Sequence, residues 1–364
     1  MTTDSHLAAS SASAEAPPST PATLSGLLSG RTGWIITDGK AGMLVQAQGV
    51  ADALGLKSES KIVALEGLMK LTAPWGGVSR RLRFGEAGSP LAPPWPDVAI
   101  ATGRASIPFI RAIKRAAGPA VFTVVLQDPK TGPGTADLIW VPQHDRRRGA
   151  NVLTTLTAPH GFTARRLASL RAVMPPEIAA LPGPRIAVVL GGKNGVYKFR
   201  DEDDDRLASA LASLAALGAS FMITPSRRTH DRLMRAAEAA TRRAPRLIWD
   251  GTGANPYADF LAHADALVVT ADSVNMTGEC CATGRPVYVF TPSGGSPKFS
   301  RFHKALESIG ATRALPATLD QLPDWRYTAL DSTGIIAAEI ERRWARRSEM
   351  LGGIVSPASR GSAA

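Results

Sequence analysis

The stretch WIITDGKAG, residues 34–42, joins an apolar run to a glycine-rich turn, and the following MLVQAQGVADALG has the period of a helix. A strand, a glycine turn and a helix in this order are typical of the first unit of a nucleotide-handling α/β domain. The turn lacks the GxGxxG or GxxxxGK[ST] spacing of a complete phosphate-binding fingerprint. It therefore predicts a parallel sheet and raises the question of what the turn itself contacts.

The same sequence of apolar run, turn and helical period recurs along the chain. The first half contains the candidate strands WIITD, SKIVAL, DVAIATG, AVFTVVLQD and DLIWVP, and the second half contains RIAVVLGG, SFMITPS, RLIWDG, DALVVTAD and RPVYVF. Strands separated by helices imply right-handed crossovers and open parallel sheets. We therefore predict an α/β protein with two Rossmann-like domains whose sheets face each other across a cleft.

A proline-rich segment, VMPPEIAALPGP, suits a linker between the two halves better than the interior of a helix or strand. The predicted parts are a disordered tail, an N-terminal domain, this linker, a C-terminal domain, a closing helix and a second tail, at residues 1–30, 31–172, 173–184, 185–330, 331–350 and 351–364. The first 30 residues have neither the basic start and apolar core of a secretory signal nor the arginines of a mitochondrial presequence. We expect a cytoplasmic protein.

The charge balance indicates a polyanionic partner. The chain has 42 basic and 31 acidic residues, a formal net charge of +11 and an isoelectric point near 10.1. Nucleic acid, an anionic membrane surface and phosphorylated ligands are all compatible with such a balance. Because no RNA-reading signature, zinc-finger spacing or basic-region heptad accompanies the arginines, we expect no nucleic-acid partner. The adjacent Cys280 and Cys281 are poor disulfide partners and read as two buried hydrophobic residues.

Two segments combine tryptophan with arginine, as membrane-surface contacts do. The region 71–96 contains Trp75, Trp95 and the motif VSRRLRF, and could instead be a surface loop that packs its tryptophans locally. In the last predicted helix, Ile336, Ile340 and Trp344 are spaced four apart and share one face. That helix is expected either to pack back on the first domain or to contact the inner face of the membrane.

Polar and glycine residues follow three successive strands of the second half, where ligands of open parallel sheets gather. Each turn alone has a simpler explanation, because a glycine pair can be a turn, an arginine pair a solvated face and a serine a helix cap. Together they favour a site for a nucleotide diphosphate, with glycine for close approach, arginine for negative charge and a helix amino end for phosphate. Glu279, six residues after the serine cap, could accept hydrogen bonds from a ribose diol. The residues of this predicted site are Gly191, Gly192, Lys193, Asn194, Ser226, Arg227, Arg228, Asp272, Ser273, Met276 and Glu279.

An ordered set of motifs supports this interpretation. TDGKAG followed by Gln46 and Gly49, then QDP, VPQHD, GGKN, SRRT and TADSVNMTGE, resembles the mitochondrial-fission "elongated mitochondria" family over residues 32–310. The second half is also similar to the donor-binding half of glycosyltransferases with two Rossmann domains, the GT-B fold. In those enzymes the nucleotide diphosphate of an activated sugar lies on the second domain and a helix glutamate holds the ribose. The resemblance assigns the ribose to Glu279 and phosphate contacts to Ser273, Gly192 and residues 226–228.

The first domain should then supply the acceptor side and the general base. Asp38, Asp128 and His144 each follow a predicted strand and are candidate bases, although Asp in such positions is also common turn chemistry. The residues expected to border the acceptor are Gly39, Lys40, Gly42, Gln46, Gly103 and Arg104. No metal site is predicted, because there is no DxD motif at a strand end and no His/Cys cluster. The acidic run DEDDD, residues 201–205, is interpreted as favourable charge at a helix start.

The sequence thus predicts a metal-independent glycosyltransferase that uses a nucleotide-diphosphate sugar as co-substrate and no other cofactor. Its acceptor is expected to be lipid-linked or held at the cytoplasmic surface of a membrane, where the protein would be peripheral. The alternative is a non-catalytic binding or recruiting protein of the mitochondrial-fission family that kept the fold and lost the chemistry.

Overall fold

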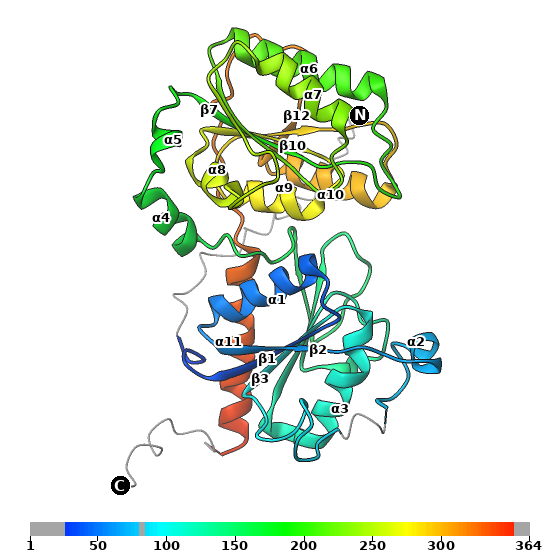
Figure 1. The fold of residues 1–364 in the computed structure, drawn as a ribbon. Coiled ribbons are helices and arrows are strands. Elements are labelled where there is room, and N and C mark those ends of the chain that lie inside the picture. The colour runs from blue at the N-terminus through cyan, green and yellow to red at the C-terminus, as the bar shows by residue number, and fades with distance from the viewer. Residues whose placement is uncertain (1–25, 80–83, 353–364) are drawn as a thin grey trace, which may run out of the picture.

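The computed structural model describes residues 26–79 and 84–352 and contains two α/β domains, one above the other in Figure 1. The strands of the lower, N-terminal domain are β1 Thr32–Thr37, β2 Lys57–Ile62, β3 Val98–Thr102, β4 Phe122–Leu126, β5 Leu138–Pro142 and β6 Val152–Thr155. Those of the upper domain are β7 Arg185–Leu190, β8 Ser220–Pro225, β9 Arg246–Ile248, β10 Ala266–Thr270, β11 Val287–Phe290 and β12 Thr312–Ala314.

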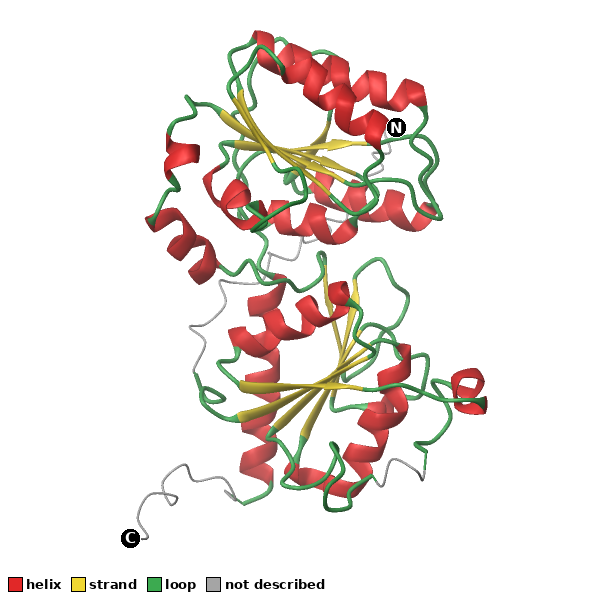
Figure 2. Cartoon of the chain, viewed as in Figure 1, coloured by secondary structure: helices red, strands yellow, loops and turns green. Residues whose placement is uncertain are grey.

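Helices cover both faces of each sheet (Figure 2). The N-terminal domain has α1 Ala41–Ala53, α2 Leu68–Thr72 and α3 Ile107–Ala117, with short 3₁₀ turns at Arg104–Ser106, Gly118–Ala120 and Pro133–Thr135. The later helices are α4 Ala164–Ala172, α5 Pro176–Ala179, α6 Asp201–Ala216, α7 Asp231–Thr241, α8 Tyr257–His263, α9 Val274–Cys281, α10 Pro297–Ser308 and α11 Ser332–Met350.

Both sheets are parallel, and each has a point where the strand order reverses. The first sheet has the order β2-β1-β3-β4-β5-β6, and the second has the order β12-β11-β10-β7-β8-β9. Their reversals lie between β1 and β3 and between β7 and β10, which is where open α/β sheets bind ligands. The predicted fold class is confirmed: the protein has two Rossmann-like domains that face each other in the GT-B arrangement.

The sheet edges differ from the predicted strands. The strand predicted over SKIVAL is β2, but it covers Lys57–Ile62, and the apolar Val63 and Leu65 follow it into the core. The edge strands β6 and β12 were not predicted. An edge strand is covered on fewer sides than a central one, so it does not need the continuous apolar run by which central strands are recognised.

The last helix closes the N-terminal domain. Helix α11 lies beside α1 (Figure 1). Its Ile336 and Ile340 are fully buried in one core cluster with Ala47 and Val50 of α1. Trp344 lies at the rim of this core, where the Arg31 guanidinium stacks 4.5 Å from its ring centre. The apolar face of α11 is therefore covered by protein. Within residues 26–79 and 84–352, no helix has both the length and the apolar character that crossing a bilayer requires.

The chain passes between the domains twice, and the two passages are hydrogen-bonded to each other. On the outward passage Thr157 shares a 2.6 Å hydrogen bond with Ser332 of the return passage. The backbone N–H of His160 donates to Thr333, whose hydroxyl donates back to the His160 carbonyl, both at 2.8 Å. Beyond this point Phe162 and Leu167 belong to the core of the second domain, ahead of the proline-rich segment.

Candidate functional site

The carboxyl ends of β7, β8 and β10 form one structure around a buried carboxylate. Asp272, which follows β10, accepts hydrogen bonds from the backbone N–H of Gly192 at 3.1 Å and from Thr270 at 2.7 Å. Arg228, on the turn that follows β8, also pairs with Asp272. Its guanidinium lies 2.6 Å from the same carboxylate. Because these contacts use both oxygens, Asp272 fixes the positions of Gly192 and Arg228 and does not face a ligand itself.

The two glycines after β7 are required by this close approach. A Cβ at Gly191 would overlap the Asp272 carboxylate, and a Cβ at Gly192 would overlap the carbonyl oxygen of Arg228. The 226–229 turn is held to the same loop, since the Thr229 hydroxyl donates to the Gly191 carbonyl at 2.7 Å. The Ser226 backbone N–H in turn donates to Thr229 at 2.9 Å. The structure therefore brings these two predicted loops into direct contact.

The remaining predicted residues of the second domain divide into supporting and exposed ones. Asn194 supports its own loop, donating to the Asp272 carbonyl at 3.1 Å and accepting from two backbone N–H groups of residues 196 and 197. Lys193 and Arg227 are exposed at the surface of the loops. Exposed cations beside fixed backbone amides suit an anionic ligand such as a diphosphate.

The helix α9 begins at this point, and its amino end lies beside the loops. Ser273 is its N-cap, and the Ser273 hydroxyl accepts from the backbone N–H of Met276 at 3.3 Å. The side chain of Met276 packs against the second core. The positive end of the helix dipole and the amides of its first turn thus border the loop carrying Gly192.

Glu279 lies on α9 and is held by a residue that the sequence did not reveal. The hydroxyl of Tyr257 on α8 donates to its carboxylate at 2.6 Å. Burial raises the pKa of Glu279 to about 7, although the Tyr257 hydrogen bond and the charge of Arg166 act in the opposite direction. Tyr257 is 22 residues away in sequence, and nothing in its local pattern indicates this contact.

This pKa predicts how stability should depend on pH. Between pH 4.5 and 7 the folded protein keeps a proton on Glu279 that the unfolded chain has released, so stability should fall as pH rises through this window. In Glu279→Gln this fall should be smaller by roughly 2 kcal/mol, the order expected for a shift of this size after allowance for partial exposure. Urea unfolding at pH 5 and pH 8 measures the difference, and parallel pH profiles for the two proteins would refute the raised pKa.

The opening turn of the sequence lies at the reversal point of the first sheet. Asp38 follows β1 and forms a 2.7 Å ion pair with Lys40, whose side chain is largely exposed. Gly103 follows β3, and a Cβ there would lie 3.3 Å from the Asp38 carboxylate and 3.0 Å from the sulfur of Met43. Gly39 and Gly103 both have positive φ, 82° and 89°, which glycine adopts without strain. The turn therefore contacts the β3 end and presents a carboxylate and a lysine there.

The helix after this turn meets the second domain. The side-chain amide of Gln46 on α1 donates to Asn275 on α9 at 3.2 Å, and it accepts from Gln127 at 3.4 Å. Gly42 also faces α9, since a Cβ there would lie 3.9 Å from the Asn275 amide. The amino-terminal halves of α1 and α9 thus oppose each other across the domain interface (Figure 1).

The other first-domain candidates have different surroundings. Asp128 is paired with Lys130 at 2.8 Å and Arg147 at 2.9 Å. Partial burial acts to raise the pKa of Asp128, but these hydrogen bonds and charges outweigh it and hold the pKa below its usual range. Arg104 does not point toward the cleft, because its guanidinium binds the carbonyl oxygen of Ala73.

His144 lies against the second domain. Its ring is edge-on to Phe302 of α10 with centroids 5.7 Å apart, and the neighbouring Asp145 forms a 2.8 Å ion pair with Lys298 of the same helix. Burial, and then the charge of Lys298, lower the pKa of His144, so the imidazole is neutral near pH 7. Its Nδ1 atom is buried and has no hydrogen-bond partner among the described residues.

The acidic run at the start of α6 is occupied by protein contacts. Asp203 accepts from the backbone N–H groups of Arg200 and Ser293, both at 2.9 Å. Asp204 is paired with His230 and Arg232 at 2.8 and 3.1 Å. Two of these acids are therefore buried and hydrogen-bonded rather than solvated. In the described parts of the chain, no group of three His, Cys, Asp or Glu side chains is placed to hold a metal ion.

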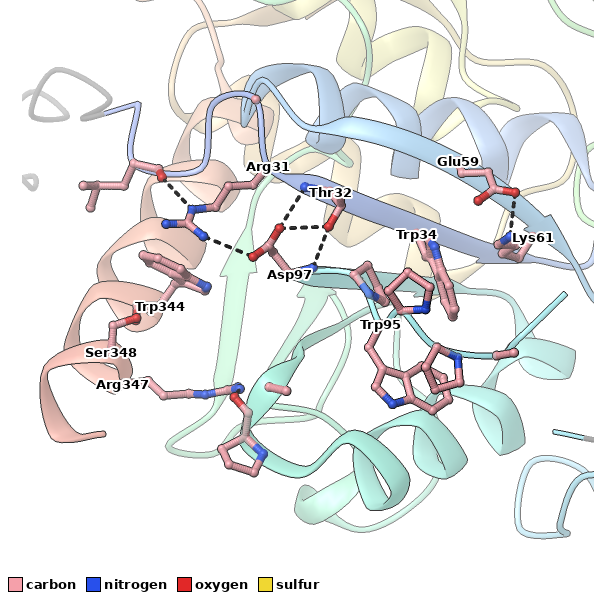
Figure 3. Close-up of a pocket in the computed structure, with 18 of the residues that line it drawn as sticks. Arg31, Thr32, Trp34, Glu59, Lys61, Trp95, Asp97, Trp344, Arg347 and Ser348 are labelled. Atoms are coloured by element: carbon pink, nitrogen blue, oxygen red, sulfur yellow. Dashed lines mark hydrogen bonds and ion pairs between the residues drawn. The ribbon is translucent and has the colours of Figure 1, made fainter. Parts of the chain in front are cut away.

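A wide hollow lies elsewhere, at the amino ends of β1 and β3 (Figure 3), and has a volume of about 1590 Å³. Four of its charged residues bind each other: Arg31 pairs with Asp97 at 3.1 Å, and Lys61 with Glu59 at 2.5 Å. Trp95 packs locally against Trp34, with ring centres 5.8 Å apart. Arg80, Arg81 and Arg83 of the VSRRLRF motif lie outside the described residues. Because ligands of parallel sheets bind at the carboxyl ends, we place the candidate site at the domain interface.

Two parallel sheets with opposed reversal points, and a helix amino end with a glutamate on the second domain, define a GT-B-like protein. The family model described as mitochondrial fission ELM1 matches residues 41–344. The chain belongs to this family, as the ordered motifs predicted.

Known proteins resemble the chain in sequence or in fold. Mitochondrial fission protein ELM1 of Arabidopsis thaliana is 30% identical over 280 residues, covering 70% of this chain and 66%, less than two thirds, of the plant protein. The UDP-GlcNAc 2-epimerase of Methanocaldococcus jannaschii aligns with 86% of this chain and 99% of its own, with TM-score 0.48 and 8% identity. MurG of Acinetobacter baumannii aligns with 90% and 96%, with TM-score 0.44 and 13% identity.

Proposed function

We propose that this protein is a metal-independent glycosyltransferase that takes a nucleotide-diphosphate sugar on its second domain. The observation that carries the proposal is the structure built around Asp272, which holds Gly192, Arg228 and the start of α9 together at the reversal point of the second sheet. Such a site presents the first-turn amides and dipole of α9, together with exposed arginine side chains, to one place, and these are the groups that stabilise a leaving diphosphate without a metal ion.

In this proposal the donor lies along α9. The diphosphate contacts the Gly192 loop, the first turn of α9 and the exposed Lys193 and Arg227. The ribose hydroxyls donate to Glu279, which already accepts a hydrogen bond from Tyr257 at 2.6 Å. The transferred sugar then extends toward the first domain, whose α1 faces α9 through Gln46 and Asn275.

The acceptor hydroxyl approaches from the first domain, and Asp38 is the proposed general base. Its position at the reversal point of the first sheet supports this role, and the Gly103 turn leaves room beside its carboxylate. The lowered pKa of Asp128, held by two cations, makes that residue a weaker base. The neutral imidazole of His144 is the second candidate. With a net charge of +11, the protein suits a lipid-linked or membrane-surface acceptor and a peripheral, cytoplasmic location on the inner face of the membrane.

A second candidate function is a non-catalytic binding or recruiting protein with the same fold. The printed name of the plant relative, a mitochondrial fission protein, favours it. So do the ion pairs that Asp38 and Asp128 form with lysines two residues later, since both carboxylates are already partnered.

Nucleotide binding tests the donor site. Thermal unfolding in the presence of UDP, GDP, ADP and CDP should show stabilisation by at least one of them, worth about 2.7 kcal/mol at 100 times its dissociation constant. Glu279→Ala should reduce this stabilisation while leaving that by inorganic pyrophosphate, which has no ribose, nearly unchanged. Equal losses for the two ligands would remove the ribose role of Glu279, and no stabilisation of the wild type by any nucleotide would refute the donor site.

A further inference from the structure

A small cavity lies between the two domains, on the side of α9 that faces α1. Its volume is about 110 Å³, and its walls come from α1, the outward passage of the chain and α9. The lining residues are Gly42, Val45, Gln46, Ala158, Pro159, His160, Asn275 and Glu279. Since a water molecule takes about 30 Å³ of liquid volume, this space holds a few waters or one hydroxyl-bearing fragment of a larger ligand.

One wall of this cavity is a histidine whose position is fixed by the fold. His160 is only 3% exposed. Its backbone carbonyl lies 2.6 Å from where a Cβ of Gly49 would be, so α1 packs directly on this part of the passage. Thr333 holds both its backbone N–H and its carbonyl at 2.8 Å. The backbone of His160 is therefore fixed where α1 and the two passages meet.

The same ring has an unused hydrogen-bond donor. Its Nδ1 atom accepts from the backbone N–H of Phe162 at 3.2 Å, which places the proton of the neutral ring on Nε2. Burial lowers the pKa of His160 to about 4, so the ring is neutral at physiological pH. The Nε2 atom is buried and finds no acceptor among the described residues. A buried donor without a partner destabilises the folded protein, and a ligand that supplies the acceptor removes that cost.

The other polar groups of the cavity indicate which ligand chemistry fits. Glu279 contributes a carboxyl that accepts from Tyr257 at 2.6 Å, and Gln46 and Asn275 are joined to each other at 3.2 Å. Above its pKa of about 7, the ionised Glu279 would repel an anion here. A hydroxyl group both accepts and donates, so it can receive the His160 hydrogen and give its own to Glu279.

We propose that this cavity binds a hydroxyl group of the nucleotide sugar, with His160 Nε2 as the donor from the interdomain passage and Glu279 as the acceptor. The inference rests on the proposed function for its ligand and adds a binding residue outside both sheets. The hydroxyl has two sources, the ribose of the nucleotide and the transferred sugar, and His160 makes binding of either one depend on the packing of the two domains.

The test uses His160→Asn, whose side-chain oxygen can still accept from the Phe162 N–H while the Nε2 donor is lost. Dissociation constants are measured by calorimetry for the best-binding member of UDP, GDP, ADP and CDP, for its 2′-deoxy analogue, and for the corresponding nucleotide-glucose. If the ribose fills the cavity, the variant should bind the ribonucleotide up to about tenfold more weakly, while the 2′-deoxy analogue changes less. If the transferred sugar fills it, only nucleotide-glucose should lose affinity. Either result supports the inference.

A second variant separates binding from folding. His160→Gln places an amide donor near the former Nε2 and should recover part of the lost affinity, whereas a purely structural role would not be rescued in a ligand-dependent way. Inorganic pyrophosphate has no sugar hydroxyl for His160 to bind, so the wild type and both variants should bind it equally. Two results would overturn the inference and leave the proposed function standing. One is that His160→Asn binds all three nucleotide ligands as tightly as the wild type does. The other is that it loses affinity equally for every ligand, pyrophosphate included. Failure of the wild-type protein to bind any nucleotide overturns both the inference and the proposed function.

Discussion

Replacing Asp38 by asparagine should lower the turnover of a nucleotide sugar by about 100-fold or more and leave donor affinity nearly unchanged, the usual result of losing a general base. Asp38 lies at the reversal point of the first sheet, on the domain that opposes the proposed donor site. Asparagine has nearly the same shape but cannot take a proton from the acceptor hydroxyl. The effect should therefore appear in kcat, measured as released nucleoside diphosphate, with little change in the affinity for the donor.

Asp128→Asn is the matched control for this experiment. Both carboxylates are about 15% exposed and both pair with a lysine two residues later, at 2.7 Å for Asp38 and 2.8 Å for Asp128. A turnover loss caused only by breaking such an ion pair would therefore occur in both variants. Full turnover in Asp38→Asn together with a large loss in His144→Ala would move the base to the imidazole at the α10 interface.

The second large effect concerns Gly192, which the second domain needs where the loops after β7, β8 and β10 are in contact. Gly192→Ala should lower the free energy of unfolding by about 2–3 kcal/mol, since a new Cβ would overlap the backbone carbonyl of Arg228 and a backbone neighbour cannot rotate aside. The separation of the two loops should also move Arg228 and the Gly192 N–H from Asp272, so that stabilisation by nucleoside diphosphates is lost. Urea unfolding with and without nucleotide measures both effects.

Gly195→Ala provides the comparison within the same loop. A Cβ at Gly195 meets no atom within 4 Å, and the change should alter stability by less than about 0.5 kcal/mol. Equal stability of the two variants would show that the loops around Asp272 are not held in contact as described.

The parts of the site that could be predicted are those with a local signal. Asp38, Gly192 and Ser273 each follow an apolar run, and the strand-end rule places such residues at one edge of a sheet whatever the rest of the chain does. The order of the strands places two of these strand ends at a reversal point, and that order depends on how whole helices pack. The sequence shows only that strand and helix periods alternate. Central strands such as β3, buried along its whole length, were recognised for the same reason.

The contacts that give these residues their roles could not be predicted, because they join distant segments. Arg228 reaches Asp272 across 44 positions, and this pairing makes the buried Asp272 a support for the loops. Tyr257 is joined to Glu279 only through the packing of α8 beside α9. In the sequence, His160 is an ordinary histidine beside a proline. Its role depends on the contacts that the two interdomain passages make around it. Arg104 is the reverse case, since a strand-end position suggests the cleft while its guanidinium binds Ala73.

The central claim is that the protein turns over a nucleotide-diphosphate sugar, and the most direct test is release of nucleoside diphosphate by the wild-type protein. UDP-, GDP-, ADP- and CDP-linked sugars are each incubated with it, with and without membrane lipids as a source of acceptor, in the presence of a metal chelator. We predict diphosphate release from at least one donor, undiminished by the chelator and at least about 100-fold slower in Asp38→Asn. Nucleotide binding without any release from any donor would contradict the enzymatic account and favour the non-catalytic binding protein.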